Sequence, residues 1–269
     1  MQILEWKAFL EEGLPIGNNF AAMTVGVFDG VHRGHKALIE RILSGGRQIL
    51  PVVISFRENH KKPGGGDYPG DITSFGQKAA VFESLGVAVM VAADLTESFR
   101  RMKGGEFLNL LRERGKMGFL AVGCDFRCGH RLDTDAHMIQ MLNDQEGIRT
   151  EIVEAVLEAG VPISSSRIRN AIRMGNFREA ELMLGRPFSY DLSGAEEISR
   201  DVPDGEFTSY TAVPDRVLPP PGTYTVILHE KNGAKKKAEI EIGEGIIRLP
   251  QGGGWECMEF SINGKGEIT

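Results

Sequence analysis

Apolar residues in the first part of the chain fall into two alternating patterns. Short unbroken apolar runs, which are typical of buried strands, occupy residues 23–28, 48–56, 87–91, 118–123 and 150–156. Between them, apolar positions recur at helical spacing over residues 33–43, 77–85, 98–114 and 133–143. A further short strand is expected at Gln2–Leu4, and Gly104-Gly105 interrupts the third helical stretch. Strands that alternate with helices predict an α/β fold with a parallel sheet.

The pattern changes after residue 188. Short β-like runs occupy residues 224–228, 237–242 and 245–249, and Asn232-Gly233 is a hairpin signal between two of them. Closely spaced short strands predict a small β-barrel-like domain. We therefore expect two domains, at residues 1–188 and 189–269.

One stretch of the first domain, from Arg57 to Ile72, shows neither pattern. It contains Gly64-Gly65-Gly66 with prolines on both sides, and such a sequence does not sustain regular structure. We expect a long loop at the carboxyl edge of the sheet, which either covers a substrate or is merely disordered.

Composition narrows the function classes. The chain has 269 residues, of which 41% are hydrophobic and 25% are charged, and a net charge of -6, which argues against a general affinity for nucleic acid. No apolar run is long enough to span a membrane, and the first residues are too polar for a signal peptide. Three cysteines, an odd number, indicate a reducing compartment, so we expect a cytoplasmic protein without membrane partners.

The first candidate site is the break after residues 23–28. Asp29-Gly30 ends the strand, and a helix is expected to begin near Arg33, so the break lies where ligands bind in open α/β sheets. The free N–H groups of a helix N-terminus favour phosphate, and His32 and His35 are spaced to face the same way. The alternative is that both histidines are surface residues and that the glycines serve only a turn.

Two further segments have the same character. Asp125 and Phe126 follow the strand at 118–123, where Asp125 is either a ligand-contacting carboxylate or a turn cap. Ser164, Ser165 and Ser166 precede a helical pattern, and Ser164 or Ser165 is expected to cap that helix. Arg167 and Arg169 are then expected in its first turn, where cations are unfavourable unless an anion is bound. Cys124, Cys128 and His130 have a spacing that suits metal, but no fourth ligand is evident, so no metal ligand is firmly assigned.

Four motifs in order along residues 20–188 resemble one family. The string from Gly26 to His35 contains His-x-Gly-His and resembles the signature of the nucleotidyltransferase superfamily, in the form found in bacterial FAD synthetases (bifunctional riboflavin kinase/FMN adenylyltransferases). Segments 123–129, 163–169 and 175–188 resemble the family's Gly-x-Asp-Phe-x-Phe-Gly, Ile-Ser-Ser-Thr-x-Ile-Arg and Leu-Gly-Arg-Pro-containing motifs. The chain departs from the family at Cys128, His130 and Ser166, and in the loop after Phe56.

The resemblance implies a Rossmann-like nucleotidyltransferase domain that transfers AMP from ATP to FMN. Mg²⁺ is expected as cofactor, because it offsets the charge of the triphosphate. It implies catalytic roles for His32, His35 and Arg169, and substrate or metal positioning by Asp125 and Phe126. The nucleotide-binding positions that it implies are Gly26, Phe28, Asp29, Gly30, Gly34, Ser164, Ser165 and Ser166.

In the same family a riboflavin kinase barrel follows. Residues 218–224 resemble its Leu-Pro-x-x-Gly-Val-Tyr element, and Thr211 and Glu256 resemble its threonine and its glutamate base. Val213 replaces an asparagine, residues 198–205 lack the glycine-rich loop, and only nine residues follow Phe260 where a helical tail is expected. We therefore expect a degenerate, truncated kinase-like domain without kinase activity.

Two other functions stay open at this point. The same fold could use a different phosphomonoester as acceptor, because the loop after Phe56 is altered. A chain that has lost one active site could also be a non-catalytic flavin- or nucleotide-binding protein. The sequence does not indicate a protein partner.

Overall fold

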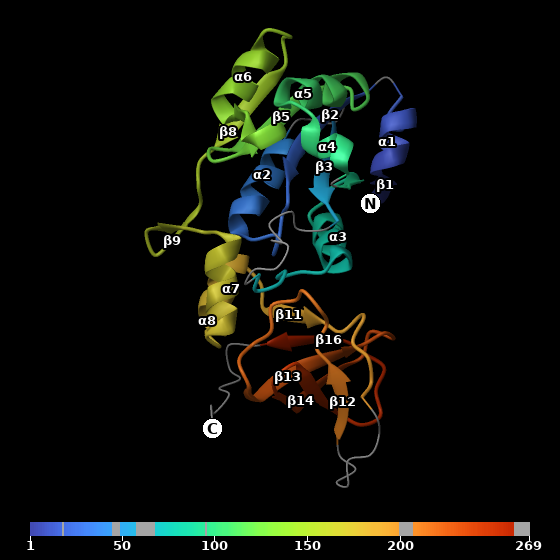
Figure 1. The fold of residues 1–269 in the computed structure, drawn as a ribbon, viewed down its shortest axis with the longest axis vertical. Coiled ribbons are helices and arrows are strands. Elements are labelled where there is room, and N and C mark those ends of the chain that lie inside the picture. Colours follow the sequence, from blue (N-terminus) through green and yellow to red (C-terminus); the bar gives the residue numbers. More distant parts are fainter. Residues whose placement is uncertain (18, 45–48, 58–67, 95, 199–206, 261–269) are drawn as a thin grey trace. The chain divides into compact units, whose positions relative to one another are not determined.

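The computed structural model describes residues 1–269 apart from 18, 45–48, 58–67, 95, 199–206 and 261–269 (Figure 1). Its contacts divide the chain into two compact units, residues 1–62 with 78–162, and residues 63–77 with 163–269. Most of the loop expected at residues 57–72, and most of the segment 198–205 in place of the kinase glycine loop, lie outside the described residues.

The first unit is built on a six-stranded sheet in the order β1-β4-β3-β2-β5-β8, and every strand is parallel to its neighbours. The strands are β1 (Gln2–Glu5), β2 (Phe20–Gly26), β3 (Ile49–Phe56), β4 (Val89–Ala93), β5 (Met117–Gly123) and β8 (Arg149–Val153). The helices are α1 (Trp6–Glu12), α2 (Arg33–Leu43), α4 (Glu97–Arg101), α5 (Gly104–Glu113) and α6 (Ala136–Asp144). Helix α3 (Phe75–Ser84) belongs to this unit from Lys78 onward, and its first three residues, up to Gln77, belong to the second unit. The expected α/β domain with a parallel sheet is confirmed. The third helical stretch is interrupted as expected, but at residues 102–103, and Gly104-Gly105 begin α5.

Both faces of this sheet are covered by helices. Successive strand residues point to opposite faces, so Met23 and Val25 of β2 share one core with Phe9 of α1 and Leu108 of α5. On β2, β3 and β5 the sheet also packs against α2, whose Ile39 is fully buried. This two-sided burial explains why the strands are continuous apolar runs.

Short elements connect the larger ones. They are β6 (Arg127–Cys128), a 3₁₀ turn (His130–Leu132), β7 (Thr134–Asp135), and the hairpin of β9 (Leu157–Glu158) and β10 (Val161–Pro162). An ion pair of 2.5 Å between Arg33 Nη1 and Glu158 Oε2 ties the hairpin to the first residue of α2. In the described part of the chain, none of the helices combines the length and the apolar character needed to cross a membrane.

The second unit contains a curled antiparallel sheet in the order β11-β16-β13-β14-β15-β12 (Figure 1). Its strands are β11 (Phe188–Asp191), β12 (Phe207–Thr211), β13 (Gly222–Glu230), β14 (Lys235–Ile242), β15 (Ile246–Pro250) and β16 (Trp255–Phe260). The expected barrel-like domain is confirmed as a half-barrel with β11 and β12 at its edges. The hairpin at Asn232-Gly233 joins β13 to β14, as expected.

Helices α7 (Ser165–Arg173) and α8 (Phe177–Leu184) belong to this second unit. The ring of Phe177 in α8 stacks on Phe260 with centroids 4.7 Å apart and lies 5.7 Å from the ring of Tyr224. The half-barrel and α8 therefore share one core. The division into sequence modules at residues 188 and 189 stays a prediction, and it differs from the division by contacts.

Candidate active site

The segment between β2 and α2 makes a tight turn with an unusual backbone. Phe28 and Val31 have φ angles of +53° and +38°, and Gly30 has +82°. Left-handed φ is rare for a β-branched residue such as Val31, and it persists only where the surroundings fix it. Phe28 and Val31 are fully buried, and the Val31 N–H donates to the Phe28 carbonyl oxygen at 3.1 Å. The turn is therefore a rigid, preorganised link between strand and helix.

The two histidines of the turn interact directly. His32 is the N-cap of α2, and its Nδ1 accepts a hydrogen bond from the His35 backbone N–H at 3.4 Å. An accepting Nδ1 carries no proton, so the ring proton of neutral His32 lies on Nε2. The imidazole of His35 also meets the Phe28 ring edge-on, at 5.1 Å between centroids. Two imidazoles at a helix N-terminus form a donor set that suits phosphate oxygens.

Two of the predicted glycine positions have a local steric reason. A Cβ on Gly34 would lie 3.2 Å from Cε1 and Nδ1 of His32, and a Cβ on Gly26 would lie 3.2 Å from the Phe28 ring. Side chains at either position would push the rings of the turn out of place. Asp29 is buried, with 4% of its surface exposed.

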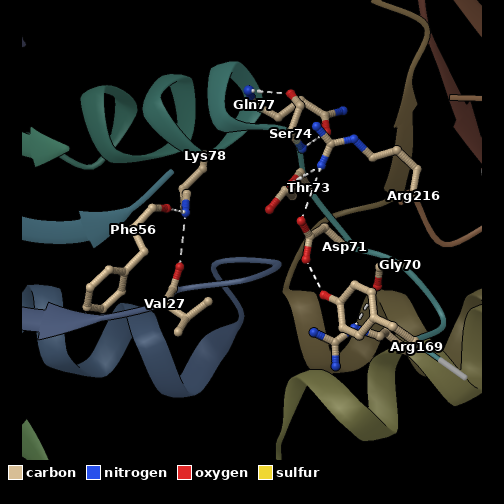
Figure 2. A network of polar contacts seen from close by, with 11 residues as sticks. Val27, Phe56, Gly70, Asp71, Thr73, Ser74, Gln77, Lys78, Arg169 and Arg216 are labelled. Atoms are coloured by element: carbon tan, nitrogen blue, oxygen red, sulfur yellow. Dashed lines mark hydrogen bonds and ion pairs between the residues drawn. The ribbon is translucent and has the colours of Figure 1, made fainter. Parts of the chain in front are cut away.

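A buried lysine, which the sequence interpretation missed, supports this turn. Lys78 of α3 donates from Nζ to the carbonyl oxygens of Val27 at 3.0 Å and Phe56 at 2.7 Å (Figure 2). Val27 follows β2 and Phe56 ends β3, so one ammonium group binds two neighbouring strand ends. The only sequence signal was a lysine within an apolar helical stretch, and long charged side chains are usually exposed.

The serine-rich motif opens α7 in the second unit. Ser164 is its N-cap and accepts from the Arg167 N–H at 3.3 Å, which confirms one of the two expected caps. Ser165 is half-buried and Ser166 is exposed. The expectation that Arg169 lies in the first turn was wrong, because α7 begins at Ser165 and places Arg169 in the second turn. The helix-dipole argument therefore applies to Arg167 only.

Arg169 is almost fully buried, with 6% of its surface exposed. Its Nε donates to the Gly70 carbonyl oxygen at 2.9 Å, and its guanidinium lies 5.5 Å from the centroid of the Tyr68 ring. Arg167, in contrast, pairs through Nη2 with Glu179 of α8 at 3.4 Å. The two arginines of the motif thus have different environments.

The motif at residues 123–129 forms a turn after β5. The Phe126 N–H donates to the Gly123 carbonyl oxygen at 3.0 Å, the Asp125 carboxylate is exposed, and Phe126 packs against the core of the first unit. Burial, with a smaller effect of Asp133, raises the pKa of the nearby Cys128 thiol to about 12. Within the described residues, no three His, Cys, Asp or Glu side chains gather in a way that could hold a metal ion.

The kinase-like positions have structural contacts. Thr211 Oγ1 accepts from the Glu196 N–H at 3.0 Å, and the Thr211 N–H donates to the Glu196 carbonyl oxygen at 2.8 Å. The Val213 N–H donates to the Tyr190 hydroxyl at 2.8 Å, and Glu256 is exposed on β16. These contacts fix a chain segment along β12, and among the residues that the structure describes no group of metal ligands gathers there.

Comparison with known proteins agrees with the motifs. The FAD synthetase family model matches residues 16–167. The bifunctional riboflavin kinase/FMN adenylyltransferase of Escherichia coli K12 is 31% identical over 212 residues. The match covers 76% of this chain and 66% of the length of that relative. The FAD synthetase of Listeria monocytogenes is 27% identical over 237 residues, which are 85% of this chain and 90% of that protein.

The fold has a close structural counterpart. The crystal structure of a macrolide-efflux protein from Streptococcus pneumoniae superposes with a TM-score of 0.83 over 100% of this chain and 92% of that one. The two sequences are 21% identical, so this likeness concerns the fold alone.

Proposed function

Because the chain belongs to the FAD synthetase family, we propose that it is an FMN adenylyltransferase, which converts ATP and FMN into FAD and pyrophosphate. The observation that carries the proposal is the stacked pair of His32 and His35 at the N-terminus of α2, with ring centroids 3.6 Å apart, after a turn held by buried side chains. The pair is preorganised, and preorganised donors are the main way in which an enzyme stabilises charge that develops on phosphate.

The reaction needs no protein nucleophile. A phosphate oxygen of FMN attacks the α-phosphorus of ATP, a new P–O bond forms, and the bond to the β-phosphate breaks as pyrophosphate leaves. The protein supplies position and charge. We assign His32 and His35 to the ATP phosphates through ring N–H donors, and Ser165, Ser166 and Arg169 to the leaving β- and γ-phosphates.

The remaining assignments concern binding. Gly26, Phe28, Asp29, Gly30 and Gly34 form the nucleotide-binding turn. Ser164 contributes by capping α7, which sets where its first N–H groups point. Asp125 and Phe126 are assigned to substrate or metal positioning.

Magnesium fits this chain as an ion that arrives with ATP. Mg²⁺ is usually held by one or two carboxylates together with substrate phosphates and water, so a cluster of three protein ligands is not required. No metal ligand is firmly assigned, and the exposed carboxylate of Asp125 is the group that we propose positions either the substrate or this ion. When bound, the ion offsets the charge of the triphosphate.

We also propose that the half-barrel lacks riboflavin kinase activity. A kinase needs a loop that holds phosphate and metal ligands together. Thr211 here bonds a backbone N–H, and Val213 offers no side-chain oxygen. An enzyme without kinase activity must obtain FMN from a separate kinase. From the cysteine count and the negative net charge, we also propose that the enzyme is cytoplasmic and acts on small molecules, not on nucleic acid.

A single incubation, divided in two, tests the proposal. The protein is mixed with ATP and Mg²⁺ and with either FMN or riboflavin, and the flavins are separated. FAD from FMN alone is expected. FAD from both substrates would overturn the loss of the kinase. No FAD from either would overturn the adenylyltransferase, and assays of pyrophosphate release with other phosphomonoesters, and of flavin binding without turnover, would then separate the two alternatives.

A further inference from the structure

A short segment, Tyr68–Ser74, which we call the strap, is hydrogen-bonded to the residues that lead into β13. Both lie in the second unit. The Asp71 N–H donates to the Asp215 carbonyl oxygen at 2.7 Å, and the Val217 N–H donates to the Asp71 carbonyl oxygen at 3.0 Å. These bonds form a parallel bridge between Asp71 and Arg216. The strap is thus paired as a strand is, although it lies far away in the sequence.

The pairing leaves no room for a side chain at Gly70. Its φ angle is +95°, and a Cβ there would lie 2.3 Å from the carbonyl carbon of Arg216. The close approach of two backbones therefore requires glycine at this position.

Side chains reinforce the backbone pairing. Arg216 Nη1 donates to the Thr73 carbonyl oxygen at 2.8 Å and lies 3.9 Å from Asp71 Oδ2 (Figure 2). The other carboxylate oxygen of Asp71 accepts from the Tyr68 hydroxyl. The side chains of Arg216 and Asp71 are only 21% and 13% exposed, so solvent screens this pair less than it screens a surface pair.

The far end of the strap is also anchored. Ser74 and Gln77 form a reciprocal cap at the start of α3, with two hydrogen bonds of 3.0 Å. Gln77 Nε2 donates to the Ser189 carbonyl oxygen of β11 at 3.0 Å. The strap is therefore fixed to the half-barrel in its middle, at Asp71, and beyond its last residue, through Gln77.

The strap in turn holds Arg169. Its Gly70 carbonyl oxygen accepts from Arg169 Nε, and its Tyr68 ring lies beside the guanidinium. A hydrogen bond at Nε and a ring contact together fix the plane of a guanidinium group. A guanidinium group whose orientation is already fixed loses little entropy when it binds phosphate oxygens. Arg169 is the arginine that we assign to the leaving phosphates.

We propose that Arg216 and Asp71 are positioning residues for adenylyl transfer, which orient Arg169 through the strap. The inference rests on the proposed function and gives the half-barrel a role in that reaction. Arg216 lies between β12 and β13, at a place that the kinase interpretation does not use.

Kinetics test the proposal. Arg216→Met and Asp71→Asn are expected to lower kcat/KM for ATP about tenfold, because a misplaced Arg169 binds the phosphates less well. KM for FMN is expected to change less than twofold. Arg216→Lys keeps a cation and is expected to restore part of the loss. The control is Arg248→Met, which removes another half-barrel arginine, paired with Glu241 at 3.0 Å, and is expected to leave kcat/KM unchanged.

A double-mutant cycle shows whether the effect passes through Arg169. In an Arg169→Ala background, Arg216→Met is expected to cost less than twofold, because the residue that it orients is gone. An equal loss in both backgrounds, or a loss confined to KM for FMN, would overturn the proposal.

A second measurement does not depend on catalysis. The Nε–H resonance of Arg169, assigned by its disappearance in Arg169→Lys, reports the hydrogen bond to Gly70 through its rate of exchange with water. Arg216→Met is expected to raise that rate about fivefold or more, since the strap loosens. An unchanged rate would overturn the proposal. If the wild-type protein makes no FAD while the rate still rises, the proposed function fails and the positioning of Arg169 stands.

Discussion

The imidazole rings of His32 and His35 lie 18° from parallel with their centroids 3.6 Å apart, so each ring limits where the other can move. His32 is also fixed as the cap of α2, and His35 rests against Phe28. The orientation of both rings is therefore built into the turn.

Replacing His35 by alanine tests its assignment. We expect kcat to fall by about 10²- to 10³-fold, which is typical of losing one preorganised donor to developing charge. The midpoint of thermal unfolding should change little, because His35 is only partly buried. The control is His137→Ala, which removes an exposed histidine of α6. A loss of a fewfold at most would count against the assignment.

Lys78→Met tests the contact between the two strand ends. The change leaves two carbonyl oxygens without their lysine donor and is expected to cost about 1–3 kcal/mol of unfolding free energy, measured in urea. Turnover should fall as well, because Val27 leads into the histidine turn. Lys7→Met, at a lysine whose side chain is 84% exposed, is the control. Equal stability of the two variants would contradict the role of Lys78.

Gly70→Ala tests the close approach of the strap. We expect a larger loss of stability than in Gly233→Ala, where φ is +87° but an added Cβ would meet no atom within 4 Å. The second variant measures backbone strain alone, about 1 kcal/mol. The difference between the two unfolding free energies then measures the steric clash with Arg216, and no difference would mean that the strap is not packed there.

Phe177→Ala tests the shared core of α8 and the half-barrel. A buried phenylalanine replaced by alanine typically costs about 3–5 kcal/mol, and we expect a value in this range from chemical denaturation. Phe20→Ala, at a residue that is 60% exposed, should cost much less. A small loss at Phe177 would show that the ring cluster contributes little.

Cysteine alkylation tests the raised pKa of Cys128, in the motif at residues 123–129. Burial raises the pKa of Cys128 to about 12, so at pH 8 its reactive thiolate is almost absent. Iodoacetamide at pH 8 should therefore modify the exposed Cys124 first, as mass spectrometry of the peptides will show. Faster alkylation of Cys128 would contradict the raised pKa.

The same pKa shift makes stability depend on pH. Because the pKa of Cys128 is higher in the folded than in the unfolded protein, the protonated thiol favours folding below about pH 9, and that contribution is lost as pH rises toward 12. The unfolding free energy of Cys128→Ala should lack this decrease between about pH 9 and 12.

Local patterns predicted much of the fold. Apolar runs marked the strands of the parallel sheet, Gly104-Gly105 indicated a break that lies just before them, and the serines marked the cap of α7. Each of these features depends on neighbours in the sequence. Strand bounds were off by a few residues where pairing with a neighbour, as at Arg149–Val153, decides the end.

Contacts between distant segments could not be predicted in this way. Lys78 is 51 residues from Val27, and Arg216 is 143 residues from Thr73. Nothing in a local pattern tells which carbonyl oxygen a long side chain will reach. Arg169 was placed one turn too early for a simpler reason: with Ser164 as the cap, α7 begins at Ser165, and its first turn ends before Arg169.

The ring of Phe177 on α8, stacked on Phe260 of β16, also limits how this protein can evolve. Selection for riboflavin kinase activity conserves the metal ligands and the loop glycines of the kinase site, and these residues can be substituted once another enzyme supplies FMN. The strands that bury Phe177 cannot be deleted in the same way, because their loss would expose an aromatic core beside the helix that carries Arg169. If the kinase activity is lost, as we propose, the half-barrel fold is therefore expected to be retained, because α8 packs on it.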